Sequence, residues 1–306
     1  MARVVSLLPS ATEIICALGF RKSLVGRSHE CDFPLEVKNL PILTAPHFPA
    51  EGTSLEIDRE VKTLVEKGLS LYKVDTEKLA ELQPDLIVTQ SQCDVCAVSE
   101  KELKAALCDW VGKAATIVSL QPDSLAAIWE DFRKVGRALG DEDSADQLIT
   151  RIQADMSRSR DKIPRHGPKP KVLCLEWLDP PMTAGNWLPE LVELAGGENL
   201  LSEAGKHSPY QTWEQIARAM PEIILVMPCG FDIPRSKKEM GILLSQPNWK
   251  KLPAVQQGRV FITDGNQYFN RPGPRLLDSF HILTEILHPE SFPPKFVDLG
   301  WVRFSS

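Results

Sequence analysis

Cysteine and histidine side chains occur in short polar segments that follow predicted strands, and their types suit a soft metal ion. Cys93 and Cys96 are spaced so that two thiolates on one turn can reach the same ion. Cys31, His29 and Cys229 are candidates to complete a set of four ligands. The same spacing also serves redox sites, thiols that touch an organic ligand and inert packing. The sequence therefore leaves open a zinc or iron site and a thiol contact to a bound molecule.

A second group of side chains suits a large organic ring system, because flat aromatic rings offer much apolar area for little loss of entropy. The candidate rings are Trp177, Trp187, Tyr268 and Phe269. Glu176 directly follows an apolar run, and Glu30 stands in the same polar loop as His29. Arg271 can hold carboxylate, phosphate or amide oxygens. Core packing and helix capping are the competing roles of these residues.

The chain lacks the common catalytic motifs. It has no G-x-S-x-G nucleophile elbow, no G-x-x-x-x-G-K phosphate loop and no G-x-G-x-x-G turn after a strand. Acid–base chemistry by paired carboxylates stays open. The acidic residues that can converge for it are Glu30, Asp32, Glu176 and Asp232. We predict that the protein is not an enzyme, with an enzyme that uses a thiolate-bound metal as the alternative.

Short apolar, β-branched runs alternate with helical patterns along the chain. The runs cover residues 4–8, 23–26, 86–89, 116–119, 171–175, 223–227 and 260–263. This alternation predicts an α/β fold with mostly parallel, doubly wound sheets. Ligands of such sheets bind beyond the carboxyl ends of the strands, and most of the candidate residues follow these runs.

The two halves of the chain resemble each other weakly. Residues 79–88 and residues 216–225 share a helix end, a proline, an acidic residue and an apolar strand. A helical pattern over residues 144–163 would rise roughly 30 Å and can connect two lobes. We predict an N-terminal α/β lobe over residues 1–140, a connecting helix over 141–165 and a C-terminal α/β lobe over 166–306. The ligand is expected in a cleft between these lobes.

Composition and charge limit the partners and the compartment. Lysine and arginine number 35 against 41 aspartates and glutamates, a net charge of −6, which disfavours nucleic acid as a partner. The sequence contains no run of 18 apolar residues, and its N-terminal segment is a poor signal peptide. We therefore expect no membrane insertion. Seven cysteines without disulfide-framework spacing are expected to be reduced thiols. We predict a cytoplasmic protein, or a periplasmic one if a leader has been removed.

Three segments carry a resemblance to a known family: residues 4–13, the Pro-Asp-Leu-Ile of residues 84–87 and the Arg-Pro-Gly-Pro-Arg of residues 271–275. In this order they resemble the helical-backbone (class III, TroA-like) substrate-binding proteins. That family includes the vitamin B12-binding and ferric-siderophore-binding components of ABC importers. The loops at residues 29–32 and 93–96 are similar to those of a leaderless branch often named cobalamin-binding. The resemblance implies two lobes joined by one long helix, a small-molecule ligand and an ABC transporter permease as partner.

The residues and the resemblance together predict a small-molecule-binding protein. Its expected ligand is a corrinoid such as cobalamin, or else a metal chelate such as an iron–siderophore. The expected bound group is therefore cobalamin or a transition metal, zinc or iron. The alternatives are a metal-binding protein or a metal- or thiol-dependent enzyme that uses the cysteine and histidine cluster. A storage or regulatory module that passes its ligand to another protein is a third hypothesis.

Overall fold

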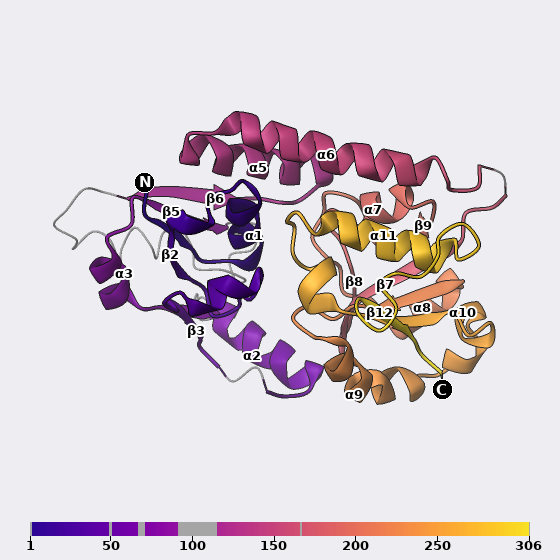
Figure 1. Cartoon of the computed structure of the whole chain (residues 1–306). Coiled ribbons are helices and arrows are strands. Elements are labelled where there is room, and N and C mark those ends of the chain that lie inside the picture. Colours follow the sequence, from indigo (N-terminus) through magenta and orange to yellow (C-terminus); the bar gives the residue numbers. More distant parts are fainter. Residues whose placement is uncertain (1, 49–50, 67–70, 91–114, 166, 306) are drawn as a thin grey trace. The chain divides into compact units, whose positions relative to one another are not determined.

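The chain folds into two compact units, each with its own sheet and its own set of strand ends (Figure 1). The computed structural model describes residues 2–48, 51–66, 71–90, 115–165 and 167–305. The first unit comprises residues 1–52, 59–122 and 126–151, and the second comprises residues 53–58, 123–125 and 152–306.

The first unit is built on a four-stranded parallel sheet with the order β2-β1-β5-β6. Its strands are β1 (Val4–Ser6), β2 (Leu24–Arg27), β5 (Leu86–Gln90) and β6 (Thr116–Leu120). A separate antiparallel pair consists of β3 (Thr44–Pro46) and β4 (Tyr72–Val74). The strand order reverses between β1 and β5, and ligands of open α/β sheets bind beside such a switch point.

Helices flank this sheet. They are α1 (Pro9–Ala17), α2 (Ser54–Glu66), α3 (Thr76–Leu82), α5 (Leu125–Leu139) and α6 (Glu142–Arg160), with 3-10 turns η1 (Arg21–Ser23) and η2 (Leu35–Asn39). Val5 and Ile87 of the sheet pack against Leu79 of α3 and against Leu43. The start of α3 is fixed because the Asp75 side chain accepts a hydrogen bond from the third helical N–H.

The second unit has a six-stranded mixed sheet with the order β12-β11-β10-β7-β8, and β9 also pairs with β7. Its strands are β7 (Lys171–Leu178), β8 (Pro181–Thr183), β9 (Glu198–Asn199), β10 (Ile223–Val226), β11 (Val260–Thr263) and β12 (Trp301–Arg303). Strands β7, β10 and β11 are parallel, whereas β12 runs antiparallel to β11. The carboxyl ends of β7, β10 and β11 therefore meet at one edge of the sheet.

Helices cover both faces of this second sheet. They are α7 (Leu188–Leu194), α8 (Trp213–Ala219), α9 (Ile233–Leu244), α10 (Pro253–Gln256) and α11 (Leu276–Leu287), with short turns η3 (Trp249–Lys251) and η4 (Gly265–Phe269). Leu173 and Leu175 share one core with Ile216 of α8 and Met240 of α9. Because side chains alternate along a strand, Val172 and Cys174 point to the opposite face. Figure 1 shows α7 and α11 together on the side away from α9.

All seven apolar runs form strands, so the predicted α/β fold with two doubly wound sheets is confirmed. The expected connecting helix corresponds to α6, which Gly140 separates from α5 with a positive φ of 81°. The compact units differ in detail from the expected lobes. Residues 53–58 and 123–125 group with the second unit, and α6 is shared, with its residues up to Arg151 in the first unit and the rest in the second. Within the described ranges, no helix combines the length and apolarity needed to cross a membrane.

Candidate functional site

A buried guanidinium holds the polar loop that follows β2 in the first unit. Arg27 is only 6% exposed, and its Nη1 donates to the carbonyls of Ser28 and Cys31, each at 3.0 Å. Its Nη2 donates to the carbonyl of Lys38 at 3.0 Å. Hydrogen bonds from a charged donor are stronger than neutral ones. The backbone of residues 28–31 is therefore fixed, and the side chain of His29 leaves it from a defined position.

Thr44 of β3 orients the His29 ring. The Thr44 hydroxyl donates to Ser28 Oγ at 2.9 Å, and Thr44 Oγ1 accepts from the backbone N–H of His29 at 3.0 Å. Thr44 Oγ1 also lies 2.7 Å from His29 Nδ1. In the tautomer with the proton on Nδ1, the ring donates to Thr44 and Nε2 keeps its lone pair. Nε2 has no hydrogen-bond partner among the described residues.

The surroundings of His29 favour the neutral ring. Burial lowers the pKa of His29, Glu30 acts against this shift, and the charge of Arg27 lowers the pKa further. The ring packs at a tilt on Tyr72 of β4 with centroids 5.2 Å apart, and the Tyr72 hydroxyl donates to Glu30 Oε1 at 2.9 Å. A neutral, half-buried imidazole with an available Nε2 lone pair can act as an axial ligand to cobalt or iron.

The predicted metal cluster is only partly within the described residues. Cys93 and Cys96 lie outside them. Cys31 is fully buried, and its sulfur accepts a hydrogen bond from the Thr12 hydroxyl at 3.0 Å. In the ranges that the structure describes, no group of three or more histidine, cysteine or acidic side chains is arranged to hold a metal ion. A cysteine-based zinc or iron site stays a prediction.

In the second unit, Glu176 and Cys229 come together at the carboxyl ends of β7 and β10. The backbone N–H of Cys229 donates to the Glu176 carbonyl at 3.1 Å. The Ser208 hydroxyl donates to Glu176 Oε2 at 2.6 Å and accepts from the N–H of Gly185 at 3.0 Å. Glu176 is half-buried and Cys229 is exposed. The backbones of Glu176 and Cys229 are therefore adjacent at this strand edge, and their role in binding a ligand stays a prediction.

The two tryptophans of this region differ in what they offer a ligand. Trp177 is half-buried, its Nε1 donates to the carbonyl of Ser54 at 3.1 Å, and its ring centroid lies 5.3 Å from that of Phe231. Trp187 is 6% exposed, and its Nε1 has no hydrogen-bond partner among the described residues. An unpaired buried donor favours binding of an acceptor, because the donor has lost its hydration.

Three further candidates follow β11. Phe269 is fully buried in the core, which corrects the prediction that its ring faces a ligand. Arg271 is 5% exposed and donates to Asn266 Oδ1 at 3.0 Å, so it holds its own loop. Tyr268 stays half-buried, with the Arg275 guanidinium 5.5 Å from its ring centroid. Tyr268 is the one of these three with ring surface left for a ligand.

Sequence reasoning missed Thr44, Tyr72, Ser208 and Phe231, which position the predicted residues. A signal for Tyr72 was present, because the short run of residues 72–74 directly precedes the helix cap at Asp75. Ser208 lies 32 residues from the carboxylate that it contacts, and no local pattern indicates that pairing.

The periplasmic binding protein family model matches residues 4–267 of the chain. The chain belongs to this family. Among its relatives is an uncharacterised ABC transporter substrate-binding lipoprotein of Bacillus subtilis, 25% identical over 95% of this chain and 81% of the relative. A vitamin B12-binding protein of Pectobacterium carotovorum is 24% identical over 90% of this chain and 84% of the relative.

The fold is also that of solved periplasmic binding proteins. A periplasmic heme-binding protein from Pseudomonas aeruginosa has a TM-score of 0.74 and 20% identity, and the match covers 100% of this chain and 98% of that structure. Residues 4–13, 84–87 and 271–275 carry a resemblance to substrate-binding proteins. The family match confirms this prediction. The family is one of binding proteins.

Proposed function

We propose that this protein captures a planar or metal-chelate ligand, with a corrinoid as the first candidate and a chelated iron species as the second. The observation that carries the proposal is the neutral His29 ring, whose Nδ1 is held by Thr44 and whose Nε2 is available as a metal ligand. Relatives named for vitamin B12 and heme binding support a ligand of this class. Both ligands contain a metal with an axial position that an imidazole can occupy.

The second unit would supply contacts of a different kind. Glu176 can accept hydrogen bonds, Trp187 can donate one from its unpaired Nε1, and Tyr268 offers an aromatic face. Amide groups on the rim of a corrinoid both donate and accept hydrogen bonds, whereas the propionates of heme only accept. The carboxylate of Glu176 therefore favours the corrinoid over heme. That both units hold the same ligand stays a prediction, and variants in each unit test it.

Titration with aquacobalamin and with hemin tests the proposal. Replacement of the cobalt-bound water by imidazole changes the visible spectrum, so binding through His29 produces a spectral shift that is absent in His29→Ala. His47→Ala, in the same unit, is the matched control and is expected to behave as the wild type. Calorimetry of Glu176→Ala measures the contribution of the second unit. Failure of both compounds to bind at micromolar protein would overturn the proposal, and binding without a His29-dependent shift would remove His29 as the metal ligand.

We also propose that the protein acts in the cytoplasm, although the relatives include a lipoprotein and a periplasmic protein. Cys16 and Cys174 are free thiols. Free thiols persist in reducing compartments. Fractionation of the native host is the test, and recovery in the periplasm or with the membrane would contradict the proposal. If the protein were recovered in the periplasm or with the membrane, the family would imply an ABC transporter permease as the partner.

A further inference from the structure

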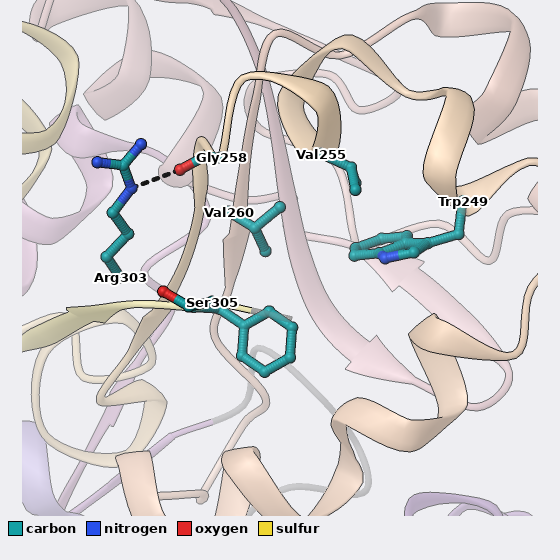
Figure 2. A pocket seen from close by; sticks show the side chains of 7 residues that line it. Trp249, Val255, Gly258, Val260, Arg303 and Ser305 are labelled. Carbon is teal, nitrogen blue, oxygen red and sulfur yellow. Dashed lines mark hydrogen bonds between the residues drawn. The ribbon is translucent and has the colours of Figure 1, made fainter.

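An apolar pocket lies at the edge of the second sheet where β11 begins and β12 ends (Figure 2). Its volume is about 310 Å³. The residues that line it are Trp249, Val255, Gly258, Val260, Arg303, Phe304 and Ser305. Glu176 and Cys229 stand at the opposite ends of the parallel strands. The pocket, here named the Trp249 pocket, is therefore separate from the candidate site at the carboxyl ends.

Most of the side chains that line the Trp249 pocket are apolar. Figure 2 shows Trp249, Val255 and Val260 around one space. The Trp249 side chain is 3% exposed, and its Nε1 has no hydrogen-bond partner in the described part of the chain. A buried donor without a partner loses its hydration without compensation. Because Nε1 itself is shielded from solvent, Trp249 offers the pocket apolar ring surface and not a hydrogen bond.

Arg303 provides a positive charge at this pocket. Its Nε donates to the Gly258 carbonyl at 2.6 Å, and its Nη2 donates to the Gln257 carbonyl at 3.3 Å (Figure 2). Neutral carbonyls orient the guanidinium but leave its charge unbalanced. Among the described residues Arg303 forms no ion pair with a carboxylate, and its Nη1 forms no hydrogen bond. The group is thus oriented by the protein and still able to bind an anion.

A second guanidinium reinforces this charge. Arg259 is half-buried, and its side chain makes neither a hydrogen bond nor an ion pair within the described residues. Burial lowers the pKa of Arg259, Glu222 acts in the opposite direction, and the charge of Arg303 lowers the pKa further. The two arginines therefore lie close enough to repel each other. An anion bound between them would relieve that repulsion.

Both arginines also line an adjoining groove of about 740 Å³. Its other charged lining residues are Lys237, Glu285 and Asp298. The Glu285 carboxylate already accepts from the N–H groups of Lys295 and Phe296 and from Trp301 Nε1. These donors are neutral, so the charge of Glu285 remains, as does that of Asp298. Among the lining residues, three cations (Lys237, Arg259 and Arg303) still outnumber these two carboxylates.

We propose that the Trp249 pocket is a second ligand site, specific for a small organic carboxylate with an aromatic or branched apolar body. The apolar body would contact Trp249, Val260 and Phe304, and the carboxylate would bind the Arg303 guanidinium beside Arg259. The pocket volume is near the lower end of the range for small-molecule sites, about 300–1,000 Å³. The site therefore accepts a molecule much smaller than a tetrapyrrole. This proposal does not depend on the function proposed for the carboxyl-end site.

Nuclear magnetic resonance of the ¹⁵N-labelled full chain can test the site directly. The chain has seven tryptophans, hence seven indole N–H signals, and the signal that disappears in Trp249→Phe belongs to Trp249. Titration with 3-phenylpropionate is expected to shift that signal and to leave the signal of Trp187 in place. The matched neutral probe 3-phenylpropanamide, which lacks the charge, is expected to bind at least roughly tenfold more weakly, since one charge-assisted hydrogen bond is lost.

Variants then separate charge from packing. Arg303→Gln is expected to weaken binding of 3-phenylpropionate roughly tenfold, and Arg303→Lys, which keeps the charge, to weaken it less. Arg218→Gln removes an exposed arginine of α8 that pairs with Glu214, and as the control it is expected to leave the affinity unchanged. Aquacobalamin binding, measured in parallel, is expected to be the same in all three variants.

Three results would overturn the proposal. The first is a Trp249 signal that no carboxylate shifts at millimolar concentration. The second is equal affinity for 3-phenylpropionate and its amide, because charge would then play no part. The third is a shift by inorganic phosphate as large as that by 3-phenylpropionate, which would show that the arginines bind any anion and that the apolar walls contribute nothing.

Discussion

The loop after β2 in the first unit and the strand ends of β7 and β10 in the second unit are stabilised by groups of different charge. In the first unit, the buried Arg27 guanidinium donates to four carbonyls of its own loop region. In the second, the neutral hydroxyl of Ser208 links the Gly185 N–H to the Glu176 carboxylate. A cation thus fixes backbone in one unit, whereas a hydroxyl positions a side chain in the other.

This difference bears on how each unit can meet a ligand. The backbone of residues 28–31 is restrained from within, so His29 presents its Nε2 with little freedom to adjust. The Glu176 carboxylate accepts from the neutral Ser208 hydroxyl, and Cys229 is exposed. We infer that the first unit is preorganised for one metal-binding geometry and that the second adapts to the periphery of the ligand.

The largest expected effect is that of Arg27→Met. The substitution removes the charged donor from the carbonyls of Ser28, Cys31 and Lys38, of which Ser28 keeps the Cys31 N–H. We expect a loss of about 3–5 kcal/mol in the free energy of unfolding of the first unit. Urea unfolding measures the loss, and hydrogen exchange shows which unit it affects. Arg218→Met, at an exposed arginine, is the control and is expected to change stability by less than about 0.5 kcal/mol. Equal unfolding midpoints for the two variants would contradict the importance of the cation.

Close backbone approach in the second unit gives the next effect. A Cβ on Gly265 would lie 2.2 Å from the carbonyl oxygen of Pro228, so Gly265→Ala must displace the loop that carries Cys229. We expect a loss of about 1–3 kcal/mol. Gly241→Ala is the matched control, because Gly241 lies in α9 with no atom within 4 Å of the added Cβ. It is expected to stabilise the protein by about 0.5–1 kcal/mol. Melting temperatures that shifted in the same direction for both variants would contradict this prediction.

Ser208→Ala tests the neutral link directly. It removes the acceptor of the buried Gly185 N–H and the donor to Glu176, and we expect a loss of about 1–2 kcal/mol, less than for Arg27→Met because no charged donor is removed. Ser245→Ala, at an exposed serine whose hydroxyl bonds to the Ile242 carbonyl, is the control with an expected change below about 0.5 kcal/mol. A loss for Ser208→Ala as large as that for Arg27→Met would remove the distinction between the two units.

The sequence predicted the sheets better than the side-chain contacts at their edges. Buried strands such as Ile223–Val226 and Val260–Thr263 were visible as continuous apolar runs, because parallel strands covered on both faces need apolar residues at every position. The short strands β3 and β4 escaped detection. Each has three residues, and their pairing joins segments 28 residues apart, from Thr44 to Tyr72, that no local pattern connects.

The candidate site shows the same limit. His29, Glu176 and Cys229 were predicted because each follows an apolar run, and their place at a strand end is local information. The burial of Phe269 could not be predicted from its neighbours, since aromatic residues in loops serve cores and ligands alike. The Thr44 hydroxyl that contacts Nδ1 of His29 comes from a strand that the sequence did not indicate.

The smallest expected effect concerns pH and separates His29 from the histidines of the second unit. Burial lowers the pKa of His29 in the folded protein below its usual value. Below about pH 6.5 the unfolded chain then binds more protons than the folded chain, so the stability of the first unit falls as the pH drops through the folded pKa. Above that range His29 has no effect on the pH dependence.

The variant His29→Gln removes this titration, so it is expected to lose less stability than the wild type between pH 7.5 and 5.5. Burial also lowers the pKa values of His281 and His288, so the second unit should keep its own acid sensitivity in the variant. Hydrogen exchange at the two pH values resolves the units. If His29→Gln left the acid response of the first unit unchanged, the pKa of His29 would be the same in the folded and unfolded chains. The fold would then not favour the neutral imidazole that sets the first unit apart from the second.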